Sequence, residues 1–245
     1  MKKKRVLIFV VTVMFWCLNL VPTNALEKSI LMNNKEFSEK IIEVAKNYKT
    51  LYIMGCFGAP MTDENKDIYT KNHEYNTEAF REKMIREASS DTFGFDCVNL
   101  IKGILWGWNG DKNEKYGGAI YNSNDVVDTN ANGMIDICED VSDDFSNIEI
   151  GEVVWLKGHI GVYIGKGLVV ECTPRWDNGV QITAMNKSIK GFHMRTWNKH
   201  GKLPWVDYIK KDSKVCVKDK GSDIIKKEKL EVKIESDVKS ENKVL

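Results

Sequence analysis

The stretch from residue 159 to residue 173 constrains the fold more than any other part of the chain. Its first half alternates apolar and other side chains, which is the two-residue period of a β-strand. Gly-Lys-Gly at 165–167 interrupts this pattern, and a second apolar run follows at 168–173. We predict a β-hairpin with a three-residue loop, in which Gly167 adopts the left-handed conformation.

The apolar residues also set the register of this hairpin. If Ile164 pairs with Leu168, one face collects the apolar side chains Ile160, Val162, Ile164, Leu168, Val170 and Cys172. The same register makes Gly161 face Glu171 and places His159 and Glu171 on the other face as diagonal neighbours, within side-chain reach. A two-residue loop would put His159 and Glu171 on opposite faces and scramble the apolar set.

Three segments before the hairpin have helical spacing. The first lies within 26–50, where Asn33 or Asn34 is a candidate cap, the second covers about 79–88, and the third, 96–106, is expected to be largely buried. We expect loops at 55–76 and 109–147, and a strand at 152–156. Helices followed by a strand-rich half predict an α+β fold.

The two ends differ from the middle of the chain. Residues 1–25 combine a basic start, an apolar run at 6–20 and a small residue, Ala25, as in a signal peptide. The run is short for a membrane span of about 20 residues, so we expect cleavage and export without stable membrane insertion, a retained anchor being the alternative. Residues 211–245 are charged, lack aromatic residues and predict a weakly ordered tail. With 36 basic and 35 acidic residues, the charge gives no reason to expect a nucleic-acid partner.

The cysteines point to one thiol with a chemical role. Cleavage after Ala25 leaves five of them: Cys56, Cys97, Cys138, Cys172 and Cys216. An odd number in an exported protein leaves at least one thiol unpaired, and the spacings fit no metal-binding pattern. Cys97 begins the third predicted helix, where the helix dipole and the free N–H groups favour thiolate, so we predict a lowered pKa. The alternative is a buried, inert cysteine.

His159 has the surroundings expected of a catalytic base. Gly158 and Gly161 remove bulk beside the ring, which lets another backbone come close. Glu171 is placed to bond one ring nitrogen. A nucleophile, a base and a third group that orients the base form the arrangement that activates a thiol.

Two motifs resemble the NlpC family of papain-like cell-wall cysteine peptidases, over about residues 51–210. They are Phe-Asp-Cys97-Val-Asn-Leu-Ile-Lys and Gly158-His-Ile-Gly-Val-Tyr-Ile-Gly-Lys-Gly. The resemblance implies a papain-like core, in which the helix carrying the nucleophile packs on an antiparallel sheet. It implies Cys97 as nucleophile, His159 as general base and then acid, and Glu171 as the orienting residue. Tyr52 resembles a family tyrosine that lies beside the nucleophile.

The resemblance further implies hydrolysis of peptidoglycan stem peptides. We expect a monomer that is secreted or associated with the cell wall and needs no cofactor. The chain departs from the usual family pattern at two places, and these departures bear on the substrate preference and the pH optimum. Val98 and Asn99 replace the small residues that usually follow the cysteine, and Glu171 stands where His, Asn or Gln is usual. Two alternatives stay open: a catalytically silent wall-binding or calcium-binding surface protein, and a papain-like acyltransferase.

Two further segments have weaker patterns. Residues 128–139 match the ligand positions of an EF-hand calcium loop at Asp128, Asn130, Asn132, Asp136 and Glu139. Because flanking helices are not predicted, we expect a polar loop and no metal. The aromatic and basic residues at 195–205 are expected to close the core rather than grip glycan, and His200 within them is a spare base candidate.

Overall fold

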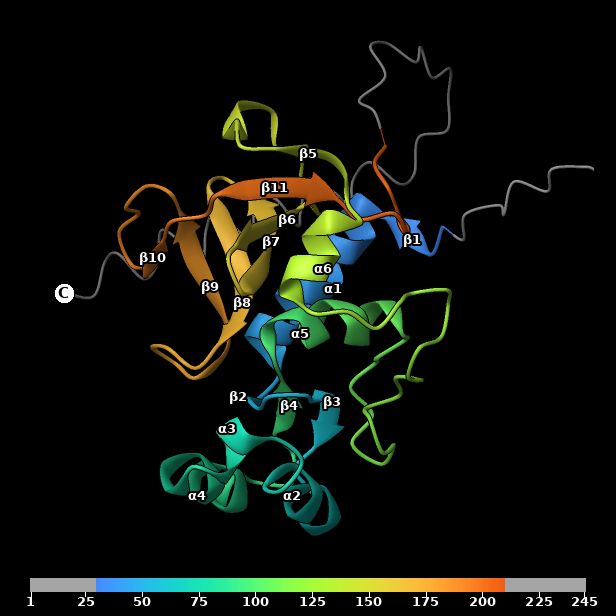
Figure 1. Ribbon diagram of the computed structural model, residues 1–245, viewed down its shortest axis with the longest axis vertical. Coiled ribbons are helices and arrows are strands. Elements are labelled where there is room, and N and C mark those ends of the chain that lie inside the picture. The colour runs from blue at the N-terminus through green and yellow to red at the C-terminus, as the bar shows by residue number, and fades with distance from the viewer. Residues whose placement is uncertain (1–29, 210–245) are drawn as a thin grey trace, which may run out of the picture. The chain divides into compact units, whose positions relative to one another are not determined.

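The computed structural model describes residues 30–209 (Figure 1). The predicted signal peptide and the charged tail lie outside these residues. Within the described range, none of the helices has the length and apolar character that a membrane span requires.

The largest element is a seven-stranded sheet in the order β10-β9-β8-β7-β6-β11-β5. Neighbouring strands are antiparallel, except that β10 runs parallel to β9. The strands are β5 (Glu139–Ser142), β6 (Val153–Leu156), β7 (His159–Gly165), β8 (Leu168–Thr173), β9 (Gly179–Met185), β10 (Met194–Arg195) and β11 (Lys199–Lys202). The predicted strand at 152–156 and both hairpin strands are present, in a mixed fold of helices and a β-sheet.

The hairpin of β7 and β8 keeps the predicted register but has a different turn. Val162 pairs with Val170, as predicted, whereas Gly165 rather than Ile164 pairs with Leu168. Lys166 and Gly167 both have positive φ angles, 53° and 74°, as a two-residue hairpin turn of type I′ requires. The shorter loop leaves one extra residue in β7, and a register shift between Tyr163 and Gly165 accommodates it. The apolar side chains therefore stay on one face of the hairpin.

A second, smaller sheet lies with three short helices below the main sheet in Figure 1. Its strands, in the order β2-β4-β3, are β2 (Thr50–Tyr52), β4 (Phe93–Phe95) and β3 (Phe57–Pro60). The helices are α2 (Asp63–Tyr69), α3 (Glu74–Thr77) and α4 (Ala79–Glu87). Helix α4 was predicted, but the loop expected at 55–76 is wrong, because it contains β3, α2 and α3. Helices α2 and α3 begin at polar capping residues, Thr62 and His73. Both helices are too short for their apolar residues to reveal a helical period in the sequence.

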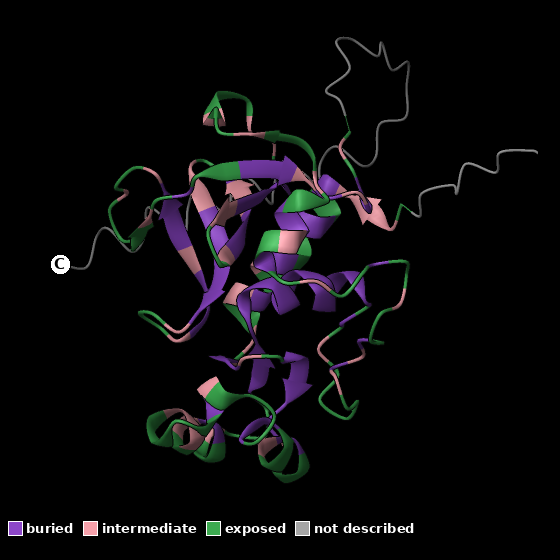
Figure 2. Ribbon diagram, viewed as in Figure 1, coloured by how far each residue is buried: buried purple, intermediate pink, exposed green. Residues whose placement is uncertain are grey.

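The core lies between the main sheet and helices α1 (Asn34–Asn47) and α5 (Cys97–Leu105). Both helices were predicted, and every residue of α5 is buried (Figure 2). Apolar side chains from α5 meet Ile160, Val162 and Val170 from the hairpin in one cluster. Helix α5 thus packs on the antiparallel pair β7 and β8, which fixes its N-terminus against the sheet.

The remaining elements tie the chain ends and the 109–147 segment to this core. β1 (Met32–Asn33) pairs in parallel with β12 (Val206–Asp207). The predicted loop at 109–147 contains α6 (Ala131–Asp136), β5 and a 3₁₀ turn at Phe145–Asn147. Trp197 and Trp205 are 2% and 6% exposed, so the aromatic segment at 195–205 closes the core, as predicted.

Replacing Asn33 by alanine should lower the free energy of unfolding by about 1 kcal/mol. Asn33 caps α1 by accepting hydrogen bonds from the backbone of Lys35 and Glu36, and Glu36 bonds back to the Asn33 N–H. Urea unfolding of the wild type, Asn33→Ala and Asn33→Asp measures the effect. Asn33→Asp retains the acceptor and should stay close to the wild type; equal losses in both variants would contradict the capping role.

Candidate active site

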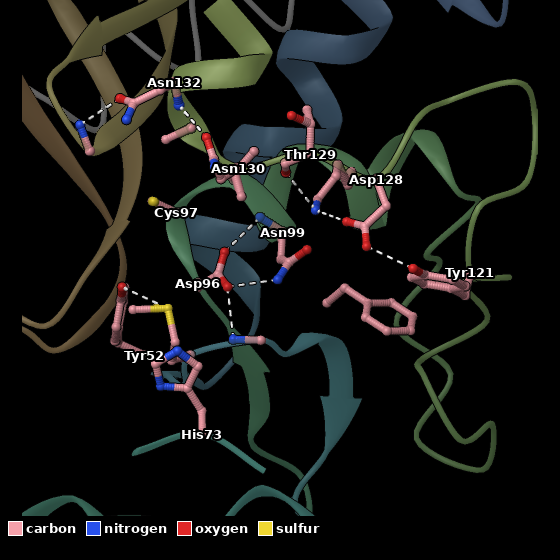
Figure 3. A pocket seen from close by; sticks show the side chains of 17 residues that line it. Tyr52, His73, Asp96, Cys97, Asn99, Tyr121, Asp128, Thr129, Asn130 and Asn132 are labelled. Atoms are coloured by element: carbon pink, nitrogen blue, oxygen red, sulfur yellow. Dashed lines mark hydrogen bonds and ion pairs between the residues drawn. The ribbon is translucent and has the colours of Figure 1, made fainter. Parts of the chain in front are cut away.

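The N-terminus of α5 is fixed by the buried carboxylate of Asp96. Its Oδ1 accepts a hydrogen bond from the backbone N–H of Asn99 at 2.8 Å. Its Oδ2 accepts from the backbone N–H of Gly55 at 2.8 Å and from the side-chain amide of Asn99 at 2.6 Å. Asn99 therefore braces this cap. The cap makes Cys97 the first residue of the helix and leaves it at the wall of a cleft (Figure 3).

The environment of the Cys97 thiol differs from the predicted one. Cys97 is 8% exposed, and burial, followed by the charge of Asp96, raises its pKa to about 12. The backbone N–H groups of Ile160, Val98 and Cys97 itself lower the pKa, but by less. The predicted fall in pKa is therefore wrong, because desolvation of the thiolate outweighs the N–H groups at the helix start.

His159 and Glu171 form the pair that the hairpin register predicts. Nε2 of His159 lies 2.7 Å from Oε2 of Glu171. The paired part of β7 and β8 ends at Val162 and Val170, so His159 lies beyond it, at the first residue of β7, where β7 pairs only with β6, through Leu156. Because a carboxylate can only accept, Nε2 carries the hydrogen and the lone pair of a neutral imidazole is on Nδ1.

The same end of β7 also contacts Cys97. The backbone N–H of Ile160, the residue after His159, is close enough to the Cys97 sulfur to favour its ionised form. The start of α5 and the start of β7 therefore lie side by side, with Cys97 next to the residue that follows His159.

Glu171 has two partners that the sequence did not reveal. Its Oε1 accepts hydrogen bonds from the Thr183 hydroxyl at 2.7 Å and from Nε of Arg195 at 2.9 Å. Arg195 also donates from Nη2 to the Thr173 hydroxyl at 3.2 Å. Burial alone would raise the pKa of Glu171, which is fully buried, but the bonds from His159 and Arg195 hold the pKa below its ordinary value. Glu171 is therefore an ionised carboxylate near neutral pH.

Trp197 covers the imidazole of His159 on one side. The two rings are stacked, with centroids 5.5 Å apart and planes at 12°. Gly161 makes room for this indole, since a Cβ there would lie 3.2 Å from Cη2 of Trp197 and 2.7 Å from Cγ1 of Val169. The prediction that Gly161 permits a close approach is confirmed: the backbone carbonyl oxygen of Val170 would lie only 3.0 Å from a Cβ at this position. A Cβ at Gly158, by contrast, would have no neighbouring atom within 4 Å.

The cleft beside Cys97 has a volume of about 660 Å³. Tyr52, proposed from the sequence as a near-site residue, lines it together with Cys97, and burial followed by the charges of Cys97 and Asp96 raises the Tyr52 pKa. Figure 3 shows His73 on the same side as Tyr52 and the 128–132 segment on the opposite wall. His73, which no sequence pattern singled out, is a lining residue whose Nδ1 accepts from the backbone of Tyr75.

The EF-hand-like segment forms part of this wall. Asn130 caps helix α6, which occupies the middle of the supposed loop. Asp128 pairs with Lys102 and with the Tyr121 hydroxyl. Asn132 accepts hydrogen bonds from the Trp155 indole and the Gly158 backbone. Between residues 30 and 209, no group of three His, Cys, Asp or Glu side chains is placed to hold a metal ion.

His200, the spare base candidate, is part of a separate buried pair. Its Nδ1 bonds the carboxylate of Glu152, and its Nε2 lies 3.0 Å from the backbone carbonyl of Asp144. Both ring nitrogens are engaged, which fits a structural role.

Comparison with known proteins gives only distant likenesses. No protein-family model and no curated protein matches the chain. Two solved structures from Trichomonas vaginalis are similar in part: NlpC2, with a TM-score of 0.37 and 12% identity, and NlpC1, with 0.32 and 11%. Each alignment covers 69% of this chain, which spans 46% and 44% of the two structures. With TM-scores under 0.5, these likenesses identify neither a family nor an activity.

Replacing Gly161 by alanine should destabilise the protein by about 1–3 kcal/mol, because the new methyl group meets the packed side chain of Val169. Thermal and urea unfolding measure the loss. Val169→Ala removes the nearest obstructing atom and serves as the paired background. The cost of Gly161→Ala should be smaller in that background, and strictly additive losses would contradict the packing explanation.

Proposed function

We propose that this chain is a cysteine peptidase of the NlpC type, with a papain-like arrangement of Cys97, His159 and Glu171. One observation carries the proposal: the sulfur of a helix-start cysteine lies at the backbone N–H of Ile160, the residue after a histidine that is bonded to a buried carboxylate. Nucleophile, base and orienting group thus come from three elements, α5, β7 and β8, and Cys97 among them lines the cleft.

The first step needs His159 as a base. Because the pKa of Cys97 is raised to about 12, the resting group near neutral pH is the thiol. Nδ1 of His159, left with the lone pair when Nε2–H donates to Glu171, takes the proton as sulfur attacks an amide carbonyl carbon. Glu171 holds the ring through its bond to Nε2–H while the imidazolium forms, and a new S–C bond forms.

The helix start supplies the groups for the oxyanion. Asp96 occupies the N–H of Asn99, whereas the N–H groups of Cys97 and Val98 already act on the sulfur and are candidates to bind the negative oxygen. His159 then returns its proton to the leaving amine as the C–N bond breaks. Water, deprotonated by His159, hydrolyses the thioester and regenerates the thiol.

The proposed substrates are peptidoglycan stem peptides, on the basis of the two sequence motifs around Cys97 and His159. The cleft supports a peptide ligand through amide and hydroxyl groups on facing walls, among them Tyr52, Asn99 and Asn132. We further propose that the protein acts outside the cytoplasm as a monomer, with export directed by residues 1–25.

Purified muropeptides digested by the protein and analysed by mass spectrometry test this function. The wild type should release new stem-peptide fragments, and Cys97→Ser should release none because the hydroxyl is a far weaker nucleophile in the same place. His159→Ala should lower the rate by about 10²–10⁴-fold.

Cys172→Ser is the matched control. This buried thiol, on β8, donates to the Phe95 carbonyl at 3.2 Å, a bond that a hydroxyl can replace. Its activity should stay near that of the wild type. Equal digestion by the wild type and Cys97→Ser, or no digestion by either, would contradict the proposal.

A further inference from the structure

A glutamate next to the catalytic histidine raises a problem of charge. If Glu171 faced His159 as an uncompensated anion, it would favour the imidazolium form. An imidazolium cannot accept the proton of Cys97, whose buried thiol depends on a base. Neutral Asn or Gln at the same place would orient the ring without this penalty.

Arg195 supplies the compensating charge. Its Nε lies 2.7 Å from Oε2 and 2.9 Å from Oε1 of Glu171, while His159 Nε2 bonds Oε2 from the other strand. The carboxylate is therefore shared between a permanent cation and the imidazole. The sum of the Glu171 and Arg195 charges is zero, so the pair presents His159 with an oriented acceptor rather than with a net negative charge.

The fold holds the guanidinium in this position. The Arg195 side chain is 10% exposed and lies over two indoles, with its Cζ 5.0 Å from the ring centre of Trp176 and 5.7 Å from that of Trp197. Trp197 in turn stacks on His159, and the other partner of Trp176 is the parallel ring of His193. This ladder of rings fixes both Arg195 and His159 relative to Glu171.

Other titratable groups near Glu171 do not provide the charge. The thiol of Cys172, the next residue of β8, interacts with Glu171, and the thiol of Cys97 and the carboxyl of Asp96 interact in turn with Cys172. Burial raises the pKa of both thiols, which are neutral near pH 7, and Asp96 is a further acid rather than a cation. The hydroxyl of Thr183 donates to Glu171 without a charge.

We propose that Arg195 is a positioning residue that neutralises Glu171, so that a glutamate can orient His159 and still leave it free to act as a base. This inference rests on the proposed function for its catalytic meaning. The charge balance that it describes, however, concerns only Arg195, Glu171 and His159, and it can be measured without substrate.

The test follows the titration of the His159 imidazole by NMR in full-length wild type, Arg195→Met, Glu171→Gln and the double variant. Arg195→Met leaves the carboxylate uncompensated, so the midpoint should move to higher pH by about one unit or more. Glu171→Gln leaves the guanidinium uncompensated, so the midpoint should move to lower pH. The double variant removes both charges and should return towards the wild-type midpoint.

Lys199→Met is the matched control, since Lys199 is an exposed cation that lies over the ring of Trp155 on the neighbouring strand β6. It should leave the midpoint unchanged. Opposite shifts in the two single variants are a signature that a loss of packing does not produce. If Arg195→Met does not fold, Arg195→Gln, which removes the charge but keeps a hydrogen-bond donor for Glu171, carries the test, and an unchanged or lowered midpoint in that variant would overturn the proposal.

The readout separates this inference from the proposed function. The predicted shifts in a protein that cleaves no muropeptide would support Arg195 and refute only the peptidase. Unshifted midpoints in a protein that does cleave would refute only the role of Arg195.

Discussion

The buried carboxylate of Glu171 is the interaction on which the arrangement of the site depends. An isolated anion in a protein interior is strongly disfavoured unless it is paired and hydrogen-bonded. Here His159, Thr183 and Arg195 bring donors from β7, β9 and β10 to its two oxygens. The sheet order β10-β9-β8-β7 is therefore joined through one side chain of β8. Loss of any one donor leaves charge or a polar group buried without its partner.

The second buried carboxylate, Asp96, has a different role. Its hydrogen bonds come from the backbone and from the amide of Asn99, and they fix where α5 begins. The same charge raises the pKa of the adjacent Cys97, so the group that positions the nucleophile also disfavours its thiolate. A thiol in this environment depends on a neighbouring base, which makes the state of His159 decisive for any chemistry at Cys97.

The parts of the structure that depend on local pattern were predictable from the sequence, whereas those that depend on contacts between distant residues were not. Alternation over 159–173 predicted the register of the hairpin and the His159–Glu171 pair, because each side chain of a strand has a fixed face. Periodicity predicted α1, α4 and α5, but the short helices at 55–76 were missed, since their ends are set by single polar caps. Arg195 reaches Glu171 only because β9 and β10 lie beside β8, an order that no local pattern contains. Likewise, the pKa of Cys97 depends on how deeply the helix start is buried, which outweighs its position in the helix.

The central claim is that Cys97 and His159 form one acid–base unit, and the rate of Cys97 alkylation tests it most directly. Iodoacetamide labelling at pH 7, followed at Cys97 by peptide mass spectrometry, compares the wild type with His159→Ala. If His159 is the base for a thiol whose pKa is otherwise about 12, the variant should react at least about tenfold more slowly. Equal rates in the two proteins would contradict the claim, because the thiol would then ionise without the imidazole.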